Sequence, residues 1–567
     1  MTNHPHTLVE LFHRRIASTP DRVAFWQRTS GGDRPITWAE FAGDVRRTAA
    51  ALARLGLEPG DRLAHVCENR YEWLVVDLAV QLCRGVHVAI HAVLSGPQVV
   101  YQINDSGARL TIVSNAELAE RLAGAADTLS TPQRFLAHEA TDMRFDGQAP
   151  QVLAELAAAE DAAAGERLER QALEQLQPSD LATLLYTSGT TGEPKGVMLS
   201  HGNLTTNALA TMQAFEMTGD DLRLCWLPLS HIFARTCDFY SWLACGYQLA
   251  LAGSRETIIA DCVRLRPTIM SGVPYFFEKL HRRLSEVGQL NTPGALQSLL
   301  GGRMRAIGSG GAALPDYLAE YFFSQRVPLL QGYGLTESSP VISASSLNAY
   351  QIGYSGRAVE GVEIRIADDG EILTRGPHVM VGYWNLPEAT AATVREGWLH
   401  TGDLGEIDAD GYLKITGRKK ELIVTSAGKN VAPVYLEALL TEDPLIAQAV
   451  VLGDGRSHLA ALIVPDFAQL DQTLLLRGRA AALPDRLEEA EVRAVVAERI
   501  AARLANVADC EQVHRFALLE HPFTIESGEL TPTLKLRREV IARRHAEVIE
   551  RMYAAPAATA CAAASPS

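Results

Sequence analysis

The chain has few cysteines, no long apolar run and no excess of basic residues, and each shortage excludes a class of protein. Its 567 residues include only eight cysteines, with no Cys-x-x-Cys pair, so the disulfide framework of a small secreted domain is excluded. The most apolar stretches, residues 73–82 and 242–253, are shorter than the roughly 20 residues that span a bilayer. The first residues lack the basic start and apolar core of a signal peptide. We therefore expect reduced thiols in a cytoplasmic protein, with weak peripheral membrane contact left open.

The charge balance is acidic. A formal net charge of -15 repels nucleic-acid phosphate unless a local basic patch overrides it, so nucleic acid is not an expected partner. Hydrophobic residues make up 47% of the chain and mean hydropathy is zero, which is typical of a globular protein with sizeable cores. The length exceeds what one core normally supports, so two or more domains are expected.

Periodicity predicts an α/β fold. The first 150 residues alternate short β-rich runs with amphipathic helical ones, which favours βα units around a parallel sheet. A charged, alanine-rich segment at 152–177 predicts a solvated helix or a helical linker that acts as a spacer. After residue 376 the pattern becomes β-like, and residues 430–550 contain two helical patterns around short strands. The predicted organisation is a large N-terminal domain of several subdomains with mixed and parallel sheets (1–417), a hinge (418–420), a small mobile α+β C-terminal domain (421–552) and a disordered tail (553–567).

One loop has the composition of a phosphate-binding turn. An apolar strand leads into Thr187, Ser188, Gly189, Thr190, Thr191 and Gly192, with Lys195 following. Glycines let the backbone N–H groups approach a ligand, hydroxyls add donors and the lysine adds one positive charge, which together suit a polyphosphate. Gly196 follows the lysine where a P-loop has Ser or Thr, so a P-loop kinase is disfavoured. The alternative is a flexible surface loop.

Two further glycine loops follow, at 307–315 and 329–340. The first could approach an adenine or ribose through backbone contacts. The second combines an aromatic ring able to stack on a purine (Tyr333), a hydroxyl (Thr336) and a carboxylate (Glu337). A carboxylate close to nucleotide phosphates usually serves Mg²⁺, which takes one or two protein oxygens. An isolated Glu337 would more often be a solvated loop acid, but two neighbouring glycine loops favour the metal.

Taken together, these loops resemble a known superfamily. The segments YTSGTTGEPKG, YGLTE, HTGDLGEIDADGYLKITGR and GELTPTLKLRR occur in the order of the adenylate-forming superfamily, which includes acyl-CoA synthetases, peptide-synthetase adenylation domains and firefly luciferase. The resemblance covers residues from about 8 to 552. Three segments look most like the long-chain fatty acyl-CoA synthetase branch: LPLSHIFAR, GRKKELIVTSAGKNVAP and GELTPTLK.

The resemblance implies an AMP-forming acid–thiol ligase. A fatty carboxylate would attack the α-phosphate of ATP to give acyl-AMP and pyrophosphate, and the thiol of coenzyme A (CoA) would then displace AMP. The expected ligands are ATP, CoA, a fatty acid and Mg²⁺. Mg²⁺, backbone dipoles and lysines would stabilise the negative charge that spreads over the phosphoryl oxygens in the transition state. The reaction requires no covalent enzyme nucleophile.

The resemblance also implies roles for residues before the hinge. Residues from Thr187 to Lys195 would hold the β- and γ-phosphates, with Thr187 and Glu337 on magnesium, and Thr336 on the α-phosphate. Asp403 matches the acid that accepts the ribose hydroxyls. The remaining nucleotide-binding set, which frames adenine and the acyl carboxylate, is Gly310, Gly311, Ala312, Gln331, Gly332, Tyr333 and Gly334.

In the C-terminal part, Arg418 matches the arginine beside the ribose and Lys420 the hinge residue. Lys535 matches the lysine that bridges the substrate carboxylate and the phosphate during adenylation. Gly428 and Lys429 match a loop that turns toward the site in the thioester step. The catalytic set implied by the resemblance is Lys535, Thr336, Glu337 and His231. His231 matches a position bordering the acyl entrance, although a buried structural histidine is nearly as good an interpretation.

Two residues depart from the pattern, and alternatives remain. Ala234 stands where the long-chain branch often has an acid, and Val424 stands where the luciferase and aryl-ligase branches have a lysine. The apolar segments 239–251 and 272–280 are candidates for the acyl tunnel wall, with ordinary core as the alternative. Rival functions are an acyl-AMP ligase that loads a carrier protein, a medium-chain or aryl acid:CoA ligase, and a nucleotide- or acyl-binding sensor without activity.

Overall fold

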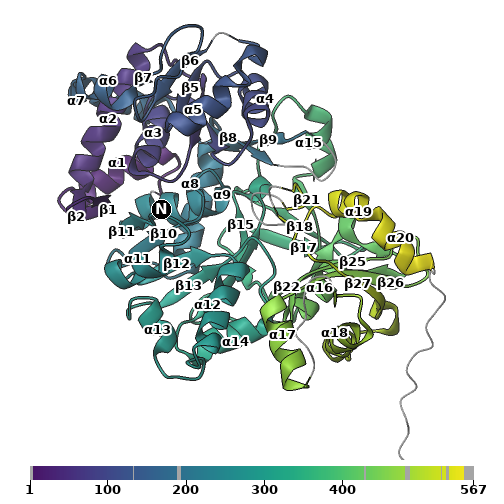
Figure 1. The fold of residues 1–567 in the computed structure, drawn as a ribbon. Coiled ribbons are helices and arrows are strands. Elements are labelled where there is room, and N and C mark those ends of the chain that lie inside the picture. Colours follow the sequence, from purple (N-terminus) through teal and green to yellow (C-terminus); the bar gives the residue numbers. More distant parts are fainter. Residues whose placement is uncertain are drawn as a thin grey trace, which may run out of the picture. The chain divides into compact units, whose positions relative to one another are not determined.

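The computed structural model describes residues 4–131, 133–187, 193–426, 429–478, 486–524, 527–530 and 536–554. The chain divides into two compact units (Figure 1). Unit 1 comprises residues 1–401 and 406–415, and unit 2 comprises residues 402–405 and 416–567. No helix within the described ranges is long and apolar enough to cross a membrane.

Unit 1 contains an eight-stranded sheet in the order β19-β9-β8-β4-β3-β5-β6-β7. Its strands are β3 (Arg62–Cys67), β4 (Val86–His91), β5 (Leu110–Val113), β6 (Arg134–Ala137), β7 (Gln151–Val152), β8 (Leu181–Thr187), β9 (Lys195–Ser200) and β19 (Gly382–Tyr383). Strands β3 to β8 pair in parallel, whereas β9 pairs antiparallel with both β8 and β19. The central strands β3 and β4 are buried along nearly their whole length, as parallel strands covered on both faces are. Most of the βα alternation predicted for the first 150 residues forms this sheet, whereas β1 and β2 join the nine-stranded one.

Helices connect the parallel strands of this sheet: α3 (Tyr71–Leu82), α4 (Gly96–Ser106) and α5 (Ala116–Ala123). Helix α2 (Trp38–Arg54) precedes β3 and leads into the sheet. Helix α2 begins at a capping box in which the Thr37 hydroxyl accepts from Glu40 N–H and the Glu40 carboxylate accepts from Thr37 N–H, satisfying N–H groups that have no partner within the helix. Helix α3 is apolar on all sides and almost wholly buried, so it lies inside the unit.

A nine-stranded sheet forms the second part of unit 1, in the order β16-β15-β14-β13-β12-β10-β11-β1-β2. Its strands are β1 (Val23–Thr29), β2 (Gly32–Thr37), β10 (Leu222–Cys225), β11 (Gln248–Leu251), β12 (Ile269–Gly272), β13 (Ala306–Ser309), β14 (Leu329–Gly334), β15 (Val341–Ala344) and β16 (Arg357–Ala358). The strands from β1 to β14 in this order pair in parallel, and β2, β15 and β16 pair antiparallel. The helices around it are α1 (Leu8–Ser18), α8 (His201–Ala214), α10 (Ser241–Cys245), α11 (Ile258–Leu265), α12 (Pro274–Glu286), α13 (Ala295–Leu299) and α14 (Asp316–Ser324).

A smaller sheet carries the end of unit 1. It contains β17 (Glu363–Ile366), β18 (Glu371–Arg375), β20 (Val394–Arg395), β21 (Trp398–Ile407) and β22 (Leu413–Arg418). Helix α15 (Pro387–Thr393) precedes β20. Strands β21 and β22 contain residues of both units.

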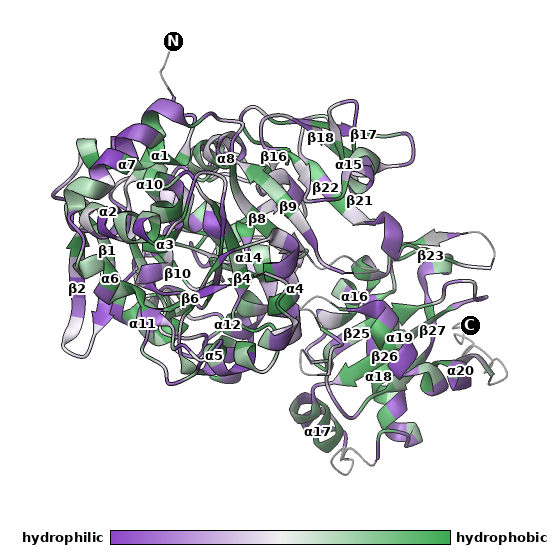
Figure 2. Cartoon of the chain, turned by 90° about the horizontal axis from the view of Figure 1, so that it is seen from above, coloured by the Kyte–Doolittle hydropathy of each residue, from purple (hydrophilic) through white to green (hydrophobic). Residues whose placement is uncertain are grey.

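Unit 2 is an α+β unit built on the three-stranded sheet β25-β26-β27. Its strands are β23 (Ile423–Val424), β24 (Asn430–Val431), β25 (Ile446–Leu452), β26 (Leu459–Pro465) and β27 (Val513–Leu518), and its helices are α16 (Pro433–Thr441), α17 (Phe467–Leu476), α18 (Ala490–Arg503), α19 (Arg538–Arg544) and α20 (Ala546–Ala554). Every residue of β26 is buried, and Figure 2 shows β25 and β26 as mainly hydrophobic. Helix α20 includes the first two residues of the predicted tail, and the rest of that tail lies outside the described residues.

The α/β fold class predicted from the sequence is confirmed, but the spacer predicted at 152–177 is wrong. The segment is helical, as α6 (Leu153–Ala158) and α7 (Ala162–Gln175), yet α7 packs closely on α2. A Cβ at Gly165 would lie 2.1 Å from the Arg46 carbonyl oxygen. The Glu169 side chain is 3% exposed and accepts from Arg46 Nε at 2.8 Å. The charged composition that suggested a solvated helix instead supplies ion pairs across this contact.

Candidate active site

The predicted phosphate-binding turn connects two antiparallel strands of the eight-stranded sheet. Thr187 ends β8, Lys195 begins β9, and the two residues pair directly. The residues between them that the sequence singled out, Ser188, Gly189, Thr190, Thr191 and Gly192, lie outside the described residues. The described part thus places the hydroxyl of Thr187 and the ammonium of Lys195 at the two ends of one short turn.

A tyrosine that the sequence analysis missed joins this turn to Glu337. Strand β19 pairs antiparallel with β9, with Tyr383 opposite Val197. The Lys195 Nζ lies 4.8 Å from the centroid of the Tyr383 ring, a cation–π contact. The Tyr383 hydroxyl donates to Glu337 Oε1 at 2.9 Å. Glu337 itself lies in a short 3-10 helix, η3 (Thr336–Ser338).

The surroundings of Tyr383 keep its hydroxyl protonated beside the Glu337 carboxylate. Burial, together with the adjacent Glu337 carboxylate, raises the pKa of Tyr383 above its ordinary value, so the phenol keeps its proton and donates. The Glu337 carbonyl accepts from Met380 N–H at 2.9 Å, which fixes the backbone on the same side. One carboxylate oxygen of Glu337 is held by Tyr383, and the group retains a second oxygen for a ligand.

We expect Tyr383→Phe to lower the adenylation kcat/KM about fivefold to tenfold, the equivalent of about 1 to 1.4 kcal/mol, because Glu337 loses a positioning hydrogen bond. The phenylalanine ring keeps the contact with Lys195, so the loss isolates the hydroxyl. The initial rate of pyrophosphate release at subsaturating ATP measures the effect, because that rate is proportional to kcat/KM for ATP. Tyr350→Phe, at an exposed tyrosine (43%), is the matched control, and equal loss in both variants would contradict the assignment.

The second and third glycine loops lie side by side. Strands β13 and β14 are parallel neighbours with Ser309 opposite Gln331, so Gly310 and Gly332 follow at the same edge of the sheet. Carboxyl ends of parallel strands are where α/β proteins bind ligands. Gly311 has a φ of +81°, a conformation in which a side chain would be strained. The structure therefore brings together the part of the predicted nucleotide set that the second and third glycine loops carry: Gly310, Gly311, Ala312, Gln331, Gly332, Tyr333, Gly334 and Thr336.

His231 reaches the second glycine loop through its neighbour Phe233. It caps a single-turn helix, α9 (Ile232–Ala234), by accepting from Phe233 N–H at 3.2 Å through Nδ1. The Phe233 ring lies over Gly310, where an added Cβ would be 3.0 Å from it. The His231 ring stacks on His91 with centroids 6.3 Å apart. Burial lowers the pKa of His91 to about 4, so this neighbour is neutral. His231 thus holds a loop against the glycines, and its part at an acyl entrance stays a prediction.

A narrow and largely apolar cavity opens beside these loops. It is lined by Phe215, Met217, Arg223, Phe233, Cys237, Ile269, Met270, Ser271, Ala306 and Gly308. Arg223 is the one charged residue of this lining, and it pairs with buried Asp238. The segment 239–251, predicted as a candidate wall, places Phe239, Trp242 and Leu249 in the main core of unit 1.

Unit 2 holds the remaining described site residues. Arg418 Nε lies 2.7 Å from Asp403 Oδ1, and the Asp403 side chain is only 4% exposed. Lys420 is exposed in the 3-10 turn η4 (Lys419–Glu421). The Lys429 N–H donates to Thr425 Oγ1 at 3.2 Å. Gly428 and Lys535 lie outside the described residues.

A family of known proteins shares this architecture and these motifs. The profile described as AMP-binding enzyme matches residues 12–384, and that described as AMP-binding enzyme C-terminal domain matches residues 420–557. The chain belongs to the AMP-binding enzyme family. The adenylate-forming superfamily predicted from the motifs is thereby confirmed, and with it a ligase that binds ATP.

Curated relatives support the long-chain branch of the resemblance. The chain is 34% identical to the long-chain-fatty-acid--CoA ligase FadD15 of Mycobacterium bovis, covering 94% of this chain and 95% of the relative. It is 27% identical to the long-chain-fatty-acid--CoA ligase ACSBG2 of Gallus gallus, covering 97% of this chain and 81% of the relative.

Solved structures share the fold. ATP-bound MatB from Rhodopseudomonas palustris is 25% identical, with a TM-score of 0.75 over 95% of this chain and 99% of that one. The anthranilate CoA ligase AuaEII, solved with anthranoyl-AMP, is 20% identical, with a TM-score of 0.78 over 96% of this chain and 98% of that one. The second comparison bears on the fold alone.

Proposed function

We propose that the protein is an AMP-forming long-chain fatty acid:CoA ligase. The carboxylate oxygen of the acid attacks the α-phosphorus of ATP, and the bond to the bridging oxygen breaks to release pyrophosphate. The CoA sulfur then attacks the acyl carbon, its proton is lost, and AMP departs. Similarity to long-chain ligases along nearly the whole chain is the observation that carries the proposal, and the assembled glycine loops support it.

The described residues suit the charge changes of the first step. Lys195 offers one cation to the triphosphate. Thr187 and Glu337 present a hydroxyl and a carboxylate oxygen, hard donors of the kind that Mg²⁺ takes while keeping several waters. A bound Mg²⁺ would neutralise phosphate charge there. Arg418 holds the buried Asp403 carboxylate in a fixed orientation for two ribose hydroxyls.

The cavity beside the loops is lined by apolar side chains of the kind that a fatty tail would contact, among them Phe215, next to Gly308, and Phe233, next to Gly310. Its volume of about 20 Å³ is far smaller than a long hydrocarbon chain, so side chains have to move before a fatty tail can enter it. Each CH₂ buried against such a lining would contribute about 0.8 kcal/mol.

AMP release from ATP by the purified full chain, across saturated acids from acetate to stearate plus benzoate and cinnamate, tests the function. A maximum at long chains, with one acyl-CoA formed for each AMP, supports the ligase. Pyrophosphate without thioester would point to a carrier protein as the acceptor. A maximum at benzoate or cinnamate would point to an aryl ligase. If no acid supports turnover, the result would favour the nucleotide- or acyl-binding sensor.

Glu337→Ala should raise the Mg²⁺ concentration for half-maximal pyrophosphate formation. Loss of outer-shell partners alone costs about tenfold to a hundredfold in metal affinity, so loss of a direct oxygen should cost at least about tenfold. A magnesium titration at fixed ATP measures the shift. Glu360→Ala, an exposed acid of the same unit, is the control. An unchanged titration would remove Glu337 from the metal site.

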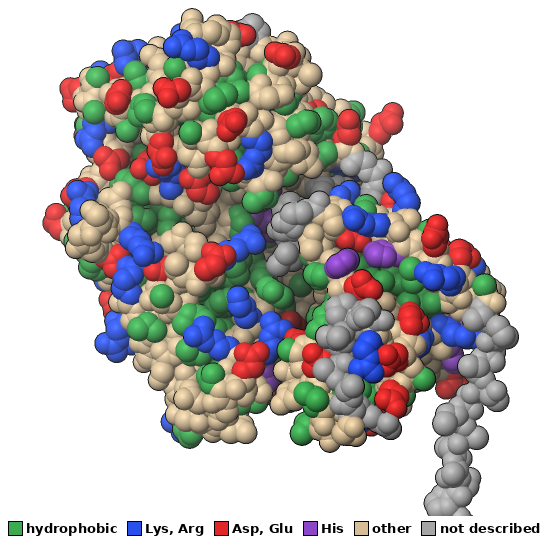
Figure 3. All heavy atoms as spheres, in the orientation of Figure 1, with side chains coloured by type: hydrophobic (Ala, Val, Ile, Leu, Met, Phe, Trp, Pro, Cys, Tyr) green, Lys and Arg blue, Asp and Glu red, His purple; other side chains and the backbone are tan. Residues whose placement is uncertain are grey.

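We also propose that the protein works in the cytoplasm and meets its hydrophobic substrate at most by peripheral membrane contact. On the face shown in Figure 3, basic and acidic side chains are interspersed among the described residues. Such a face gives no broad field of one sign to attract anionic lipid. Co-flotation with anionic vesicles tests the contact, and strong salt-sensitive binding would contradict it.

A further inference from the structure

A row of histidines is buried between the eight-stranded sheet and α3, away from the glycine loops. His65 lies on β3, His87 on β4 and His138 directly after β6. His65 Nδ1 is 3.1 Å from His87 Nε2, and His65 Nε2 is 2.9 Å from His138 Nε2. The three residues are 0%, 0% and 9% exposed. Neither the sequence motifs nor the proposed reaction uses them.

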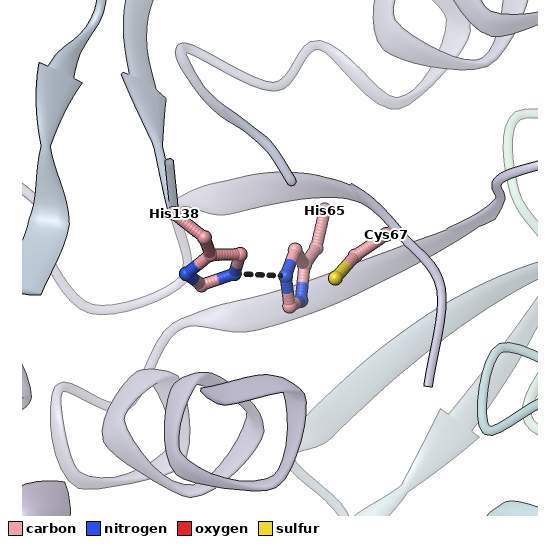
Figure 4. A group of neighbouring side chains, drawn as sticks. All are labelled: His65, Cys67 and His138. Carbon is pink, nitrogen blue, oxygen red and sulfur yellow. Dashed lines mark hydrogen bonds between the residues drawn. The ribbon is translucent and has the colours of Figure 1, made fainter. Parts of the chain in front are cut away.

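A thiol completes the group at one end of this row. Cys67 lies two residues after His65, so both side chains leave β3 on the same face, and Cys67 is 2% exposed. One ligand atom of each of His65, Cys67 and His138 lies within 4.8 Å of the other two. Figure 4 shows the His65 ring between the His138 ring and the Cys67 sulfur.

The other end of the row fixes which nitrogen of His65 bears the proton. His87 Nδ1 lies 2.7 Å from Asp77 Oδ1. Arg235 Nη2 is 2.9 Å from the same nitrogen, but Arg235 also binds Asp77 and keeps that carboxylate ionised. Two lone pairs would repel at 2.7 Å, so the hydrogen is on His87 Nδ1. His87 Nε2 must then accept from His65 Nδ1, which leaves a lone pair on His65 Nε2.

That lone pair accepts the Nε2–H of His138 at 2.9 Å, since two lone pairs would repel here as well, so a metal at His65 Nε2 requires the His138 proton to move to its Nδ1. A carboxylate–histidine chain behind a ligating histidine is the usual outer shell of a zinc site, because it fixes the tautomer and the ring orientation. His138 and Cys67 are buried, at 9% and 2% exposed, and a metal would have to displace the Cys67 thiol proton on binding.

We propose that His65 Nε2, Cys67 Sγ and His138 Nε2 form a zinc site. Two imidazoles and one thiolate are a donor set that favours Zn²⁺ over the hard cation expected at Glu337. Zn²⁺ binding exchanges the S–H bond for Zn–S and releases one proton, while the His138 proton moves from Nε2 to Nδ1 so that Nε2 can bind the metal. With Zn–N distances of about 2.0 to 2.1 Å, tetrahedral geometry separates the nitrogens by about 3.3 Å. The two imidazoles therefore need to part by only a few tenths of an ångström.

The site adjoins the proposed active site along one strand. His87, behind the zinc ligands, and His91, which stacks on His231, are both on β4. Its three ligands come from two strands separated by β5 in the sheet. A bound metal would therefore cross-link β3 to the end of β6 from the α3 side of the sheet.

Metal binding to the full chain tests the proposal. The chain is stripped with chelator and titrated with Co²⁺ as a spectroscopic probe, and zinc in the purified protein is measured by elemental analysis. We expect one Zn²⁺ per chain and a cobalt–thiolate absorption band. Cys67→Ser should abolish the band, and His87→Gln should weaken Co²⁺ binding about tenfold to a hundredfold. Cys83→Ser, at another buried thiol, should retain both signals.

Absence of bound zinc and of the cobalt band, or a band unchanged in Cys67→Ser, would overturn the proposal and leave a closed hydrogen-bond cluster. Tryptophan fluorescence checks that each variant is folded. If Cys67→Ser does not fold, His138→Gln, at the edge of the cluster, answers the same question. The binding readout is independent of turnover, so failure of the ligase assignment leaves this test intact.

Discussion

Arg235→Met should lower the free energy of unfolding of unit 1 by about 3 to 5 kcal/mol, because it leaves a buried carboxylate without its cation. Arg235 is fully buried. It binds Asp77 and donates to Tyr240 Oη at 2.8 Å and Thr183 Oγ1 at 2.7 Å. Methionine fills similar space but neutralises none of the Asp77 charge.

Urea unfolding followed by tryptophan fluorescence measures this loss, since all seven tryptophans lie in unit 1. Arg375→Met is the matched control. Arg375 pairs with Glu363 at the surface, where the two side chains are 47% and 59% exposed, so its loss should cost under about 1 kcal/mol. Removing both charges, as Asp77→Leu with Arg235→Met, should restore most of the stability. Equal costs for the two arginines would contradict this account.

The same network predicts a pH dependence. Burial opposes ionisation of Asp77, yet Arg235, together with hydrogen bonds from His87 and Tyr240, holds the pKa of Asp77 below its ordinary value. A group with a depressed folded-state pKa contributes its stability above its unfolded pKa of about 3.9 and loses it as pH falls through the folded value. Unfolding midpoints of the parent and Arg235→Met should therefore converge as the pH falls below about 4.

Local sequence predicted the loops better than it predicted their partners. Glycine, hydroxyl and lysine residues within a few positions of one another predict a ligand-binding turn, because the ability of the backbone to approach a ligand and the charge it meets there are local properties of the sequence. Tyr383 could not be found this way. It reaches Glu337 only because β19 adds to the edge of β9, a pairing of segments far apart in the chain. The aromatic-rich segment at 382–384 is the only local signal, and it is equally typical of core.

The zinc candidate and the packing of helix α7 escaped prediction for the same reason. His65 and Cys67 are two residues apart on β3, a spacing that is typical of ordinary strand alternation. Only the fold places His138 near them, on the other side of β5. In α7 the sequence shows many charges, but Glu169 is buried because Gly165 lets the helix approach α2 closely enough for Arg46 to reach it. Burial depends on the partner, and no partner is visible in a single segment.

Lys535→Ala should reduce acyl-AMP formation by at least about a hundredfold and leave thioester formation from supplied acyl-AMP nearly unchanged. We assign the Lys535 ammonium to the bridge between two anions, the acyl carboxylate and the α-phosphate, which must approach each other only in the first step. Removing one preorganised charge-stabilising group typically costs about 10²- to 10³-fold. Lys535→Arg keeps the charge, but a planar guanidinium cannot replace a point charge at that bridge, so we expect only partial rescue.

The two half-reactions are measured separately, as pyrophosphate release from ATP and fatty acid, and as acyl-CoA formed from acyl-AMP and CoA. Lys414→Ala, at a lysine of unit 1 whose side chain is 44% exposed, should alter neither. Lys429→Ala provides the converse case. Its loop is assigned to the thioester step, but the Lys429 backbone is already held by Thr425, so removing the side chain should slow the second half-reaction only slightly. Equal loss of both half-reactions in Lys535→Ala would refute the assignment, because a lysine that only maintained the fold would not distinguish between them.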